Sequence, residues 1–141
     1  MGRKILAMAI GLITGISIFA VIAIISTRFG LAPRYVEFWS RAEMYQYWSS
    51  RPETVYILML LGWMLASLTA GWITTKTAPE QDMMLPLLVS AIMLGVGAVF
   101  FFAVTPGQPY WMVLLSLLST IPVALLGHRF AGNHRVPEPI E

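Results

Sequence analysis

The side chains best suited to chemistry lie in one segment, residues 34–53, of a chain that is otherwise mostly hydrocarbon. Its charged groups include two carboxylates, Glu37 and Glu43, and two arginines, Arg34 and Arg41. The carboxylates are six residues apart, a spacing that does not point both at one spot on a helix. With its aromatic rings, the segment forms a candidate interfacial or partner surface made of Tyr35, Phe38, Trp39, Arg41, Glu43, Tyr45 and Trp48.

Three interpretations of this segment remain open. Aromatic rings with polar edges favour the headgroup zone of a bilayer, and arginines extend their stems along apolar surface while keeping their charge in water. The segment is therefore a candidate membrane anchor. It is also a candidate docking surface for a protein partner. The third interpretation is an enzyme site in the headgroup layer, built from Arg34, Glu37, Arg41 or Glu43.

Other catalytic and metal-binding groups are scarce. The chain has no cysteine, which excludes thiolate chemistry and disulfides. Its two histidines, His128 and His134, are six residues apart near the C-terminal end, so one helix face does not present both. The serines of the apolar segments have no histidine or aspartate near them in those segments, as a nucleophile requires. We therefore expect no cofactor and no bound metal.

The composition indicates a membrane protein. Of the 141 residues, 57% are hydrophobic and 11% are charged, and the mean hydropathy is +0.73. A soluble domain carries roughly 25% charged residues, so the surplus apolar surface must face lipid. The net charge is only +2 and there is no run of basic residues, which argues against nucleic acid as a partner.

Four apolar segments are long enough to cross a bilayer, which takes about 20 helical residues. They span about residues 5–26, 54–75, 85–104 and 110–127, and none contains a charged residue. Because lipid offers no hydrogen bonds to the backbone, these segments must be helices. The sequence predicts an all-α, four-helix membrane bundle in a single domain, residues 1–141, with a first loop at 27–53 and a polar tail at 128–141.

The first segment has a basic start but an apolar stretch of about 21 residues. Signal peptides have cores of roughly 7–15 residues, so an uncleaved anchor is the favoured interpretation. Arg3 and Lys4 place the N-terminus in the cytoplasm, and four crossings return the C-terminus there. We expect the lipid bilayer, in a bacterial inner membrane, to be the main partner.

The first loop contains a helix signal of its own. The sequence "SRAE" at 40–43 matches a capping box, with Ser40 as the N-cap and Glu43 as its partner. This pattern predicts a short interfacial helix over about 41–49. Pro52 suits the first turn of the next helix, where its missing N–H costs nothing.

Small residues spaced four apart let helices approach closely in lipid. Each apolar segment has such a set, and the candidate packing positions are Gly11, Gly15, Gly62, Ala66, Ala70, Ala91, Gly95, Ser116 and Thr120. Packing within one bundle is the favoured interpretation, and a homodimer face is the alternative. Pro122 predicts a kink in the last segment, with Ser119 or Thr120 available to bond freed backbone groups.

Proton-coupled transporters and ion pumps place charges inside the membrane, and this chain has none there. The leading functional hypothesis is a non-enzymatic structural or accessory subunit of a homo-oligomer or of a larger membrane complex. A transporter or channel for a neutral or lipophilic solute is the alternative, because such a solute needs no buried charge. The headgroup-layer enzyme is the third hypothesis.

Four stretches carry a resemblance across nearly the whole chain: "RKILAMAIGLITG", "AEMYQYWSSRPE", "LGWMLASLTAGW" and "PGQPYWMVLLSLLSTIPVALLGHRFA". They resemble small, uncharacterised bacterial four-span membrane proteins. These share a basic start, a glycine-containing first span, a loop helix before a proline, and a proline-containing turn between the last two spans. The resemblance implies the same four-span architecture and implies no activity.

Overall fold

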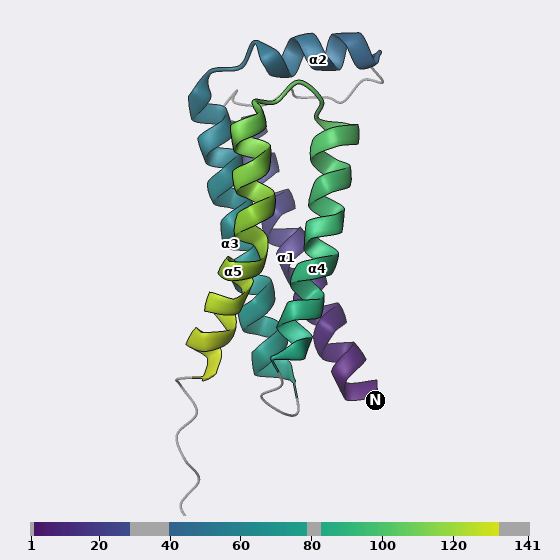
Figure 1. Ribbon diagram of the computed structural model, residues 1–141, viewed down its shortest axis with the longest axis vertical. Coiled ribbons are helices and arrows are strands. Elements are labelled where there is room, and N and C mark those ends of the chain that lie inside the picture. Colours follow the sequence, from purple (N-terminus) through teal and green to yellow (C-terminus); the bar gives the residue numbers. More distant parts are fainter. Residues whose placement is uncertain (1, 29–39, 79–82, 133–141) are drawn as a thin grey trace, which may run out of the picture.

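Four long helices lie side by side and a short helix crosses their ends (Figure 1). The computed structural model describes residues 2–28, 40–78 and 83–132, and within them it contains helices and turns but no strand. The elements are α1 (Gly2–Arg28), α2 (Arg41–Ser49), α3 (Glu53–Thr77), α4 (Met84–Val99), the π-helical segment η1 (Phe100–Val104) and α5 (Tyr110–Gly132). The predicted all-α four-helix architecture is confirmed.

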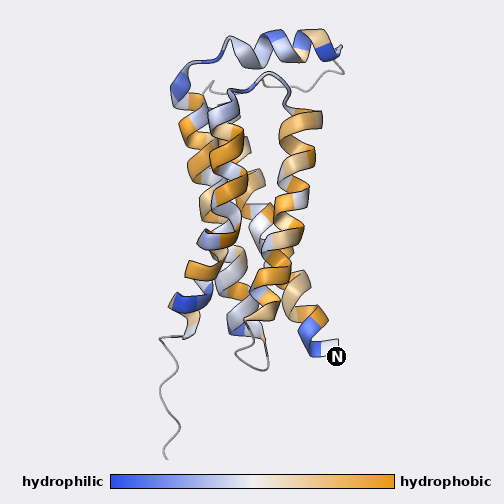
Figure 2. Cartoon of the chain, in the orientation of Figure 1, coloured by the Kyte–Doolittle hydropathy of each residue, from blue (hydrophilic) through white to orange (hydrophobic). Residues whose placement is uncertain are grey.

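The four long helices are those that the hydropathy predicts to cross a membrane, with α4 and η1 forming one continuous crossing. Apolar residues predominate along them, whereas much of α2, the start of α1 and the last turns of α5 are polar (Figure 2). Their length and composition identify the chain as an integral membrane protein. Gly2 and the end of α5 lie at the end of the bundle opposite α2 (Figure 1).

The last helix runs further than its hydropathy indicates. The fourth apolar segment was predicted to end at residue 127, but α5 continues to Gly132. Residues 128–132 therefore belong to the helix, not to a polar tail. The physical reason is a tertiary contact: Thr75 Oγ1 and His128 Nδ1 lie 3.0 Å apart, which holds this turn against α3.

The seam between α1 and α3 is antiparallel and is built from small side chains. A Cβ placed on Gly11 would collide with Thr74 and the carbonyl of Ala70, and one on Gly15 would lie 2.9 Å from the Ala70 side chain. Further along, a Cβ on Gly62 would lie 2.9 Å from a methyl group of α1. The predicted small residues of these two helices thus pack against each other inside one bundle.

The seam between α3 and α5 brings two parallel helices into backbone contact. A Cβ on Gly71 would collide with the Ala124 carbonyl, and one on Gly127 would collide with the carbonyl of Leu68. At Thr75, the hydroxyl donates to Gly71 O at 2.8 Å. Its oxygen therefore accepts from His128 Nδ1–H. Although α4 and α5 are neighbours in the chain, α5 packs most extensively on α3.

Trp63 of α3 lies at the centre of the bundle and contacts the other three crossings. Its Nε1–H donates to Thr120 Oγ1 of α5 at 2.9 Å, and Thr120 in turn donates to Ser116 O at 2.8 Å. Its ring meets Phe19 of α1 edge-on at 5.2 Å and Phe101 of η1 at 5.6 Å. Because it is fully buried, the indole links all four crossings through both packing and a hydrogen bond.

In α4, the glycine that packs against another helix is Gly97, which is not one of the two predicted positions, Ala91 and Gly95. Ala91 and Gly95 are exposed, and nothing lies within 4 Å of a Cβ built on Gly95. Gly97 lies against Trp63 instead, where an added Cβ would be 2.6 Å from the indole ring. Within the described chain, the outward face of α4 is therefore uncovered at Gly95, and Ala91 is exposed one turn earlier.

Two local departures from α-helical bonding shape α4 and α5. At the end of η1, the N–H and hydroxyl of Thr105 both donate to Phe100 O, at 3.0 and 3.2 Å. In α5, Pro122 has no N–H to give to the carbonyl four residues earlier. Ser119 and Thr120, expected to compensate, both donate to Ser116 O instead.

Candidate functional site

Helix α2 begins at the predicted capping box. The Glu43 carboxylate accepts from Ser40 N–H at 2.7 Å and from Ser40 Oγ at 2.9 Å, while Glu43 N–H lies 3.4 Å from Ser40 Oγ. These hydrogen bonds, first that of the backbone and then that of the side chain, lower the pKa of Glu43 from its ordinary value of 4.5. Because its charged form is held by the cap, Glu43 serves the helix rather than acting as a general acid.

A cluster of aromatic and cationic groups fixes the other end of α2 to α3. The Arg51 guanidinium lies over the Tyr47 ring, 3.7 Å from its centre, and Arg51 Nε donates to Tyr47 O at 3.4 Å. Tyr56 of α3 donates its hydroxyl to Trp48 O. Burial raises the pKa of the Tyr47 hydroxyl. The elbow between α2 and α3 is thus a defined structure and not a loose linker.

Glycine at position 107 lets α2 rest on the turn between η1 and α5. Its φ is +93°, a conformation that side chains rarely adopt. A Cβ built there would lie 2.5 Å from Tyr45 O and 3.0 Å from Tyr45 Cα. The α2 backbone and the turn are therefore in direct contact, and α2 is held at its middle by the turn and at its C-terminal end by the elbow.

A cavity of about 240 Å³ lies where α2 meets this turn. Its walls come from α2, η1, the turn and the first residues of α5: Arg41, Tyr45, Phe101, Phe102, Pro106, Gly107, Gln108, Tyr110 and Val113. A second hollow of about 430 Å³ adjoins it, since both are lined by Arg41 and Phe102, and the second adds Met44 and Ala103. Together we call them the α2–turn cavity. It is mainly aromatic and aliphatic, with few polar groups.

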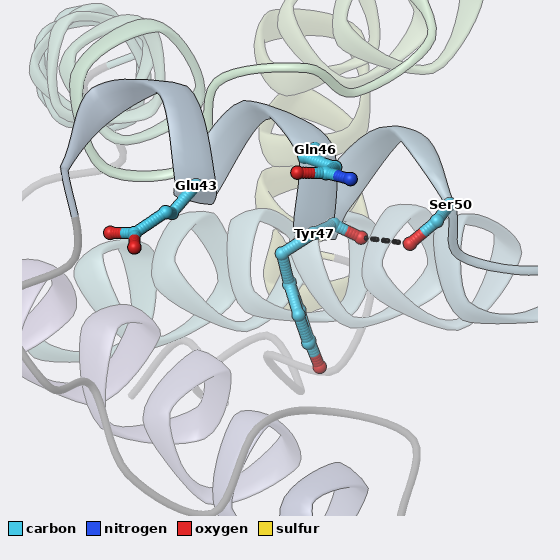
Figure 3. A pocket seen from close by; sticks show the side chains of 4 residues that line it. All are labelled: Glu43, Gln46, Tyr47 and Ser50. Carbon is cyan, nitrogen blue, oxygen red and sulfur yellow. Dashed lines mark hydrogen bonds between the residues drawn. The ribbon is translucent and has the colours of Figure 1, made fainter.

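A third hollow, of about 290 Å³, lies along α2 itself and is more open. Glu43, Gln46, Tyr47 and Ser50 line it (Figure 3). Ser50 Oγ donates to Tyr47 O at 2.8 Å, and the Glu43 carboxylate is engaged in the cap. Two of its polar groups, the Glu43 carboxylate and the Ser50 hydroxyl, therefore already have partners within the helix or its cap, which makes it a weaker candidate for binding.

The predicted surface residues of α2 separate in the structure. Arg41 and Tyr45 line the α2–turn cavity, whereas Glu43 lines the open hollow and Trp48 joins the elbow. The remaining predicted positions lie outside the described residues: Tyr35, Phe38 and Trp39, with Arg34 and Glu37.

Sequence reasoning missed one polar residue of the cavity, Gln108. It is only 7% exposed, and its Oε1 has no hydrogen-bond partner, while its Nε2 lies 3.7 Å from Met59 Sδ. The sole sequence signal is an amide between a glycine and a proline in the turn "TPGQP". Such a residue is ordinarily solvent-exposed, and tertiary packing, including the contact with Met59 of α3, buries it here.

The buried polar groups of the described residues are mostly neutral hydrogen-bonding groups. Of the described residues that are buried, the polar side chains are serines, threonines, Gln108 and the Tyr56 hydroxyl, and none is a carboxylate, a histidine, a lysine or an arginine. No group of three or more His, Asp or Glu side chains among residues 2–28, 40–78 and 83–132 is placed to hold a metal ion. The site offers a cation, Arg41, a hydrogen-bond acceptor, Gln108, and an apolar wall.

Comparisons of the chain with protein-family models, with curated proteins and with solved structures find no match.

Proposed function

We propose that this chain is a non-enzymatic structural or accessory subunit of a membrane assembly, either with copies of itself or with a larger complex. The observation that carries the proposal is the interior of the bundle. It is closed by glycine and alanine contacts around Trp63, and none of its buried described residues is a carboxylate, a histidine, a lysine or an arginine. A core of this kind supports a fixed shape and provides no site for proton or ion coupling.

The outward face of α4 is the surface that we assign to the partner. Ala91 and Gly95 are exposed there, between the exposed side chains of Leu88, Ile92 and Val99. Small residues at this spacing let another helix approach its backbone. The predicted small residues of α1, α3 and α5 are buried inside the bundle, so Ala91 and Gly95 of α4 are the exposed members of the predicted set.

Purification in a mild detergent, followed by native mass spectrometry, tests this proposal. We expect the protein to elute with a second copy or with another membrane protein at a fixed ratio. Gly95→Leu should abolish the association without unfolding the chain, because nothing lies within 4 Å of that position. Leu118→Phe, which changes an exposed side chain of α5, is the matched control and should leave it intact.

The alternative function makes a different prediction in the same preparation. A lone monomer that moves a neutral solute across liposomes would replace the accessory role with a transport role. A lone monomer without such activity would also contradict the proposal. If Gly95→Leu leaves the association unchanged, the partner binds a surface other than the outward face of α4.

We further propose that the chain belongs to the small bacterial four-span proteins that it resembles, in an inner membrane with both termini in the cytoplasm. Arg3 and Lys4 favour a cytoplasmic N-terminus. The start of α1 and the end of α5 lie at the same end of the bundle, which supports placing both termini on one side of the membrane (Figure 1). The chain has no cysteine, so a single introduced cysteine is the one thiol that a maleimide can label. An impermeant maleimide added outside intact spheroplasts should label Ser49→Cys and not Gly132→Cys. The reverse pattern would invert the topology.

A further inference from the structure

The α2–turn cavity lies outside the crossings, at the end of the bundle where the polar layer of a bilayer meets them. On one side it has the exposed Arg41 of α2, and on the other the exposed Tyr110 at the start of α5. Its floor is apolar and includes the buried Phe101. A ligand for this cavity therefore combines a polar part with a hydrocarbon part.

Gln108 supplies the first requirement for a ligand. More than nine-tenths of the residue is buried, and Oε1 has no donor among its neighbours. An unsatisfied buried acceptor is costly, and native structures seldom keep one without a function or a bound molecule. The last torsion of a glutamine is soft, so Oε1 can turn into the cavity that this side chain lines. The missing partner is a hydrogen-bond donor, such as a hydroxyl group.

Arg41 supplies the second requirement. It lines both parts of the cavity, and no described residue forms an ion pair or hydrogen bond with its guanidinium. A guanidinium offers a planar fork of donors that matches phosphate. The third requirement comes from Phe102, which is exposed and lines both parts of the cavity beside Met44. This apolar strip is suited to an acyl chain.

The geometry points to an anionic phospholipid with a hydroxyl-bearing headgroup, of the phosphatidylglycerol type, as the ligand of the α2–turn cavity. Its phosphate pairs with Arg41, its headgroup hydroxyl donates to Gln108 Oε1, and its acyl chain lies along Phe102. This inference does not depend on the proposed accessory role, since lipid recognition needs neither a second copy nor a partner.

Lipid retention by the purified full chain tests the assignment. The protein in mild detergent is incubated with equal amounts of phosphatidylglycerol, phosphatidylmethanol and phosphatidylcholine of identical acyl chains, and bound lipid is counted by native mass spectrometry. Phosphatidylmethanol has the same charge without the hydroxyls. We expect phosphatidylglycerol to be retained most and phosphatidylcholine least.

Three variants separate the contributions. Arg41→Gln should reduce the preference for the two anionic lipids over phosphatidylcholine by about fivefold, which is the effect of one interfacial arginine. Arg129→Gln removes an equally exposed charge at the other end of α5 and should change nothing. Gln108→Leu should remove the preference for phosphatidylglycerol over phosphatidylmethanol while keeping the preference for anionic lipid.

Two results would overturn the inference. One is an equal effect of Arg41→Gln and Arg129→Gln on the preference for anionic lipids over phosphatidylcholine. The positive charge of the protein would then attract these lipids without a specific binding site at Arg41. The other is displacement of the lipid by millimolar inorganic phosphate alone, which would make free phosphate the ligand. Circular dichroism of each variant shows whether the helices are intact, and Arg41 is exposed, so that its loss leaves the packed core unchanged.

Discussion

Gly71 is the position where the α3–α5 seam is most sensitive to a single added methyl group. An alanine Cβ there would overlap the Ala124 carbonyl oxygen and lie 2.7 Å from its carbon. Carbon atoms pack at about 3.5–4.0 Å, so the two helices would have to separate by about 1 Å. The obstacle is backbone, which cannot rotate away as a side chain would.

The free-energy change follows from this overlap. Overpacking of a well-packed interior costs about 1–3 kcal/mol, and a backbone obstacle places Gly71→Ala at the upper end of that range. The change from glycine to alanine also favours the helix by about 0.8–1.0 kcal/mol. Gly95→Ala has the same helical gain and no neighbour within 4 Å. The difference between the two variants therefore isolates the overlap, at about 2–3 kcal/mol.

Unfolding in mixed micelles with increasing sodium dodecyl sulfate, followed by the fluorescence of Trp63 and the other tryptophans, measures this difference. A value near 2.8 kcal/mol corresponds to a hundredfold change in the unfolding equilibrium. A second variant sharpens the test. Since the overlap is with the backbone of residue 124, adding Ala124→Gly to Gly71→Ala should restore nothing.

Two outcomes would refute this reasoning. Equal stability of Gly71→Ala and Gly95→Ala would mean that the α3–α5 seam is not in backbone contact. Recovery of stability in the double variant would mean that the side chain of residue 124, and not its carbonyl, sets the spacing between the helices.

Three further predictions concern the centre of the bundle and α2. A double-mutant cycle of Trp63→Phe and Thr120→Val should give a coupling free energy of about 0.6–1 kcal/mol. A value near zero would mean that the hydrogen bond between these two side chains does not stabilise the bundle. The pKa of Glu43 is lowered in the folded chain, so the cap stabilises α2 above pH 4.5 and loses this contribution as the pH falls through the lower folded value. The NMR chemical shift of the Ser40 amide should change with pH with a midpoint below 4.5. Glu43→Gln should abolish this titration. A midpoint at or above 4.5 would contradict the role of Glu43 in the cap. Gly107→Ala should displace α2 from the turn, with faster amide hydrogen exchange in α2 and little change in α3, because its φ is +93° and a Cβ would press on Tyr45.

Features that depend on local sequence could be predicted, often to the residue. The capping box at Ser40 and Glu43 needs only residues three apart, and α2 begins and ends where the sequence indicates. The four crossings follow from hydrocarbon length, because lipid leaves the backbone no other way to satisfy its hydrogen bonds. The end of α5 was missed because Thr75, more than fifty residues earlier, provides the contact that holds His128.

Features that depend on how whole helices are rotated could not be predicted. Gly95 and Gly97 are equally small, and the rotation of α4 toward Trp63 decides which of them is buried. Gln108 is polar and lies in a turn, and its burial comes from tertiary packing that its local sequence does not indicate. Pattern reasoning identified the cation of the cavity, Arg41, but it had no means of finding the acceptor opposite it.

The parallel pairing of α3 with α5 bears on how the chain is assembled during synthesis. The ribosome delivers α3 to the membrane before α5, so Gly71 faces lipid or the insertion machinery until the fourth crossing emerges. The earlier partner, α1, can dock at once through Gly11 and Gly15. A nascent chain halted before Tyr110 would thus hold three of the four crossings, with Gly71 of α3 still uncovered by α5.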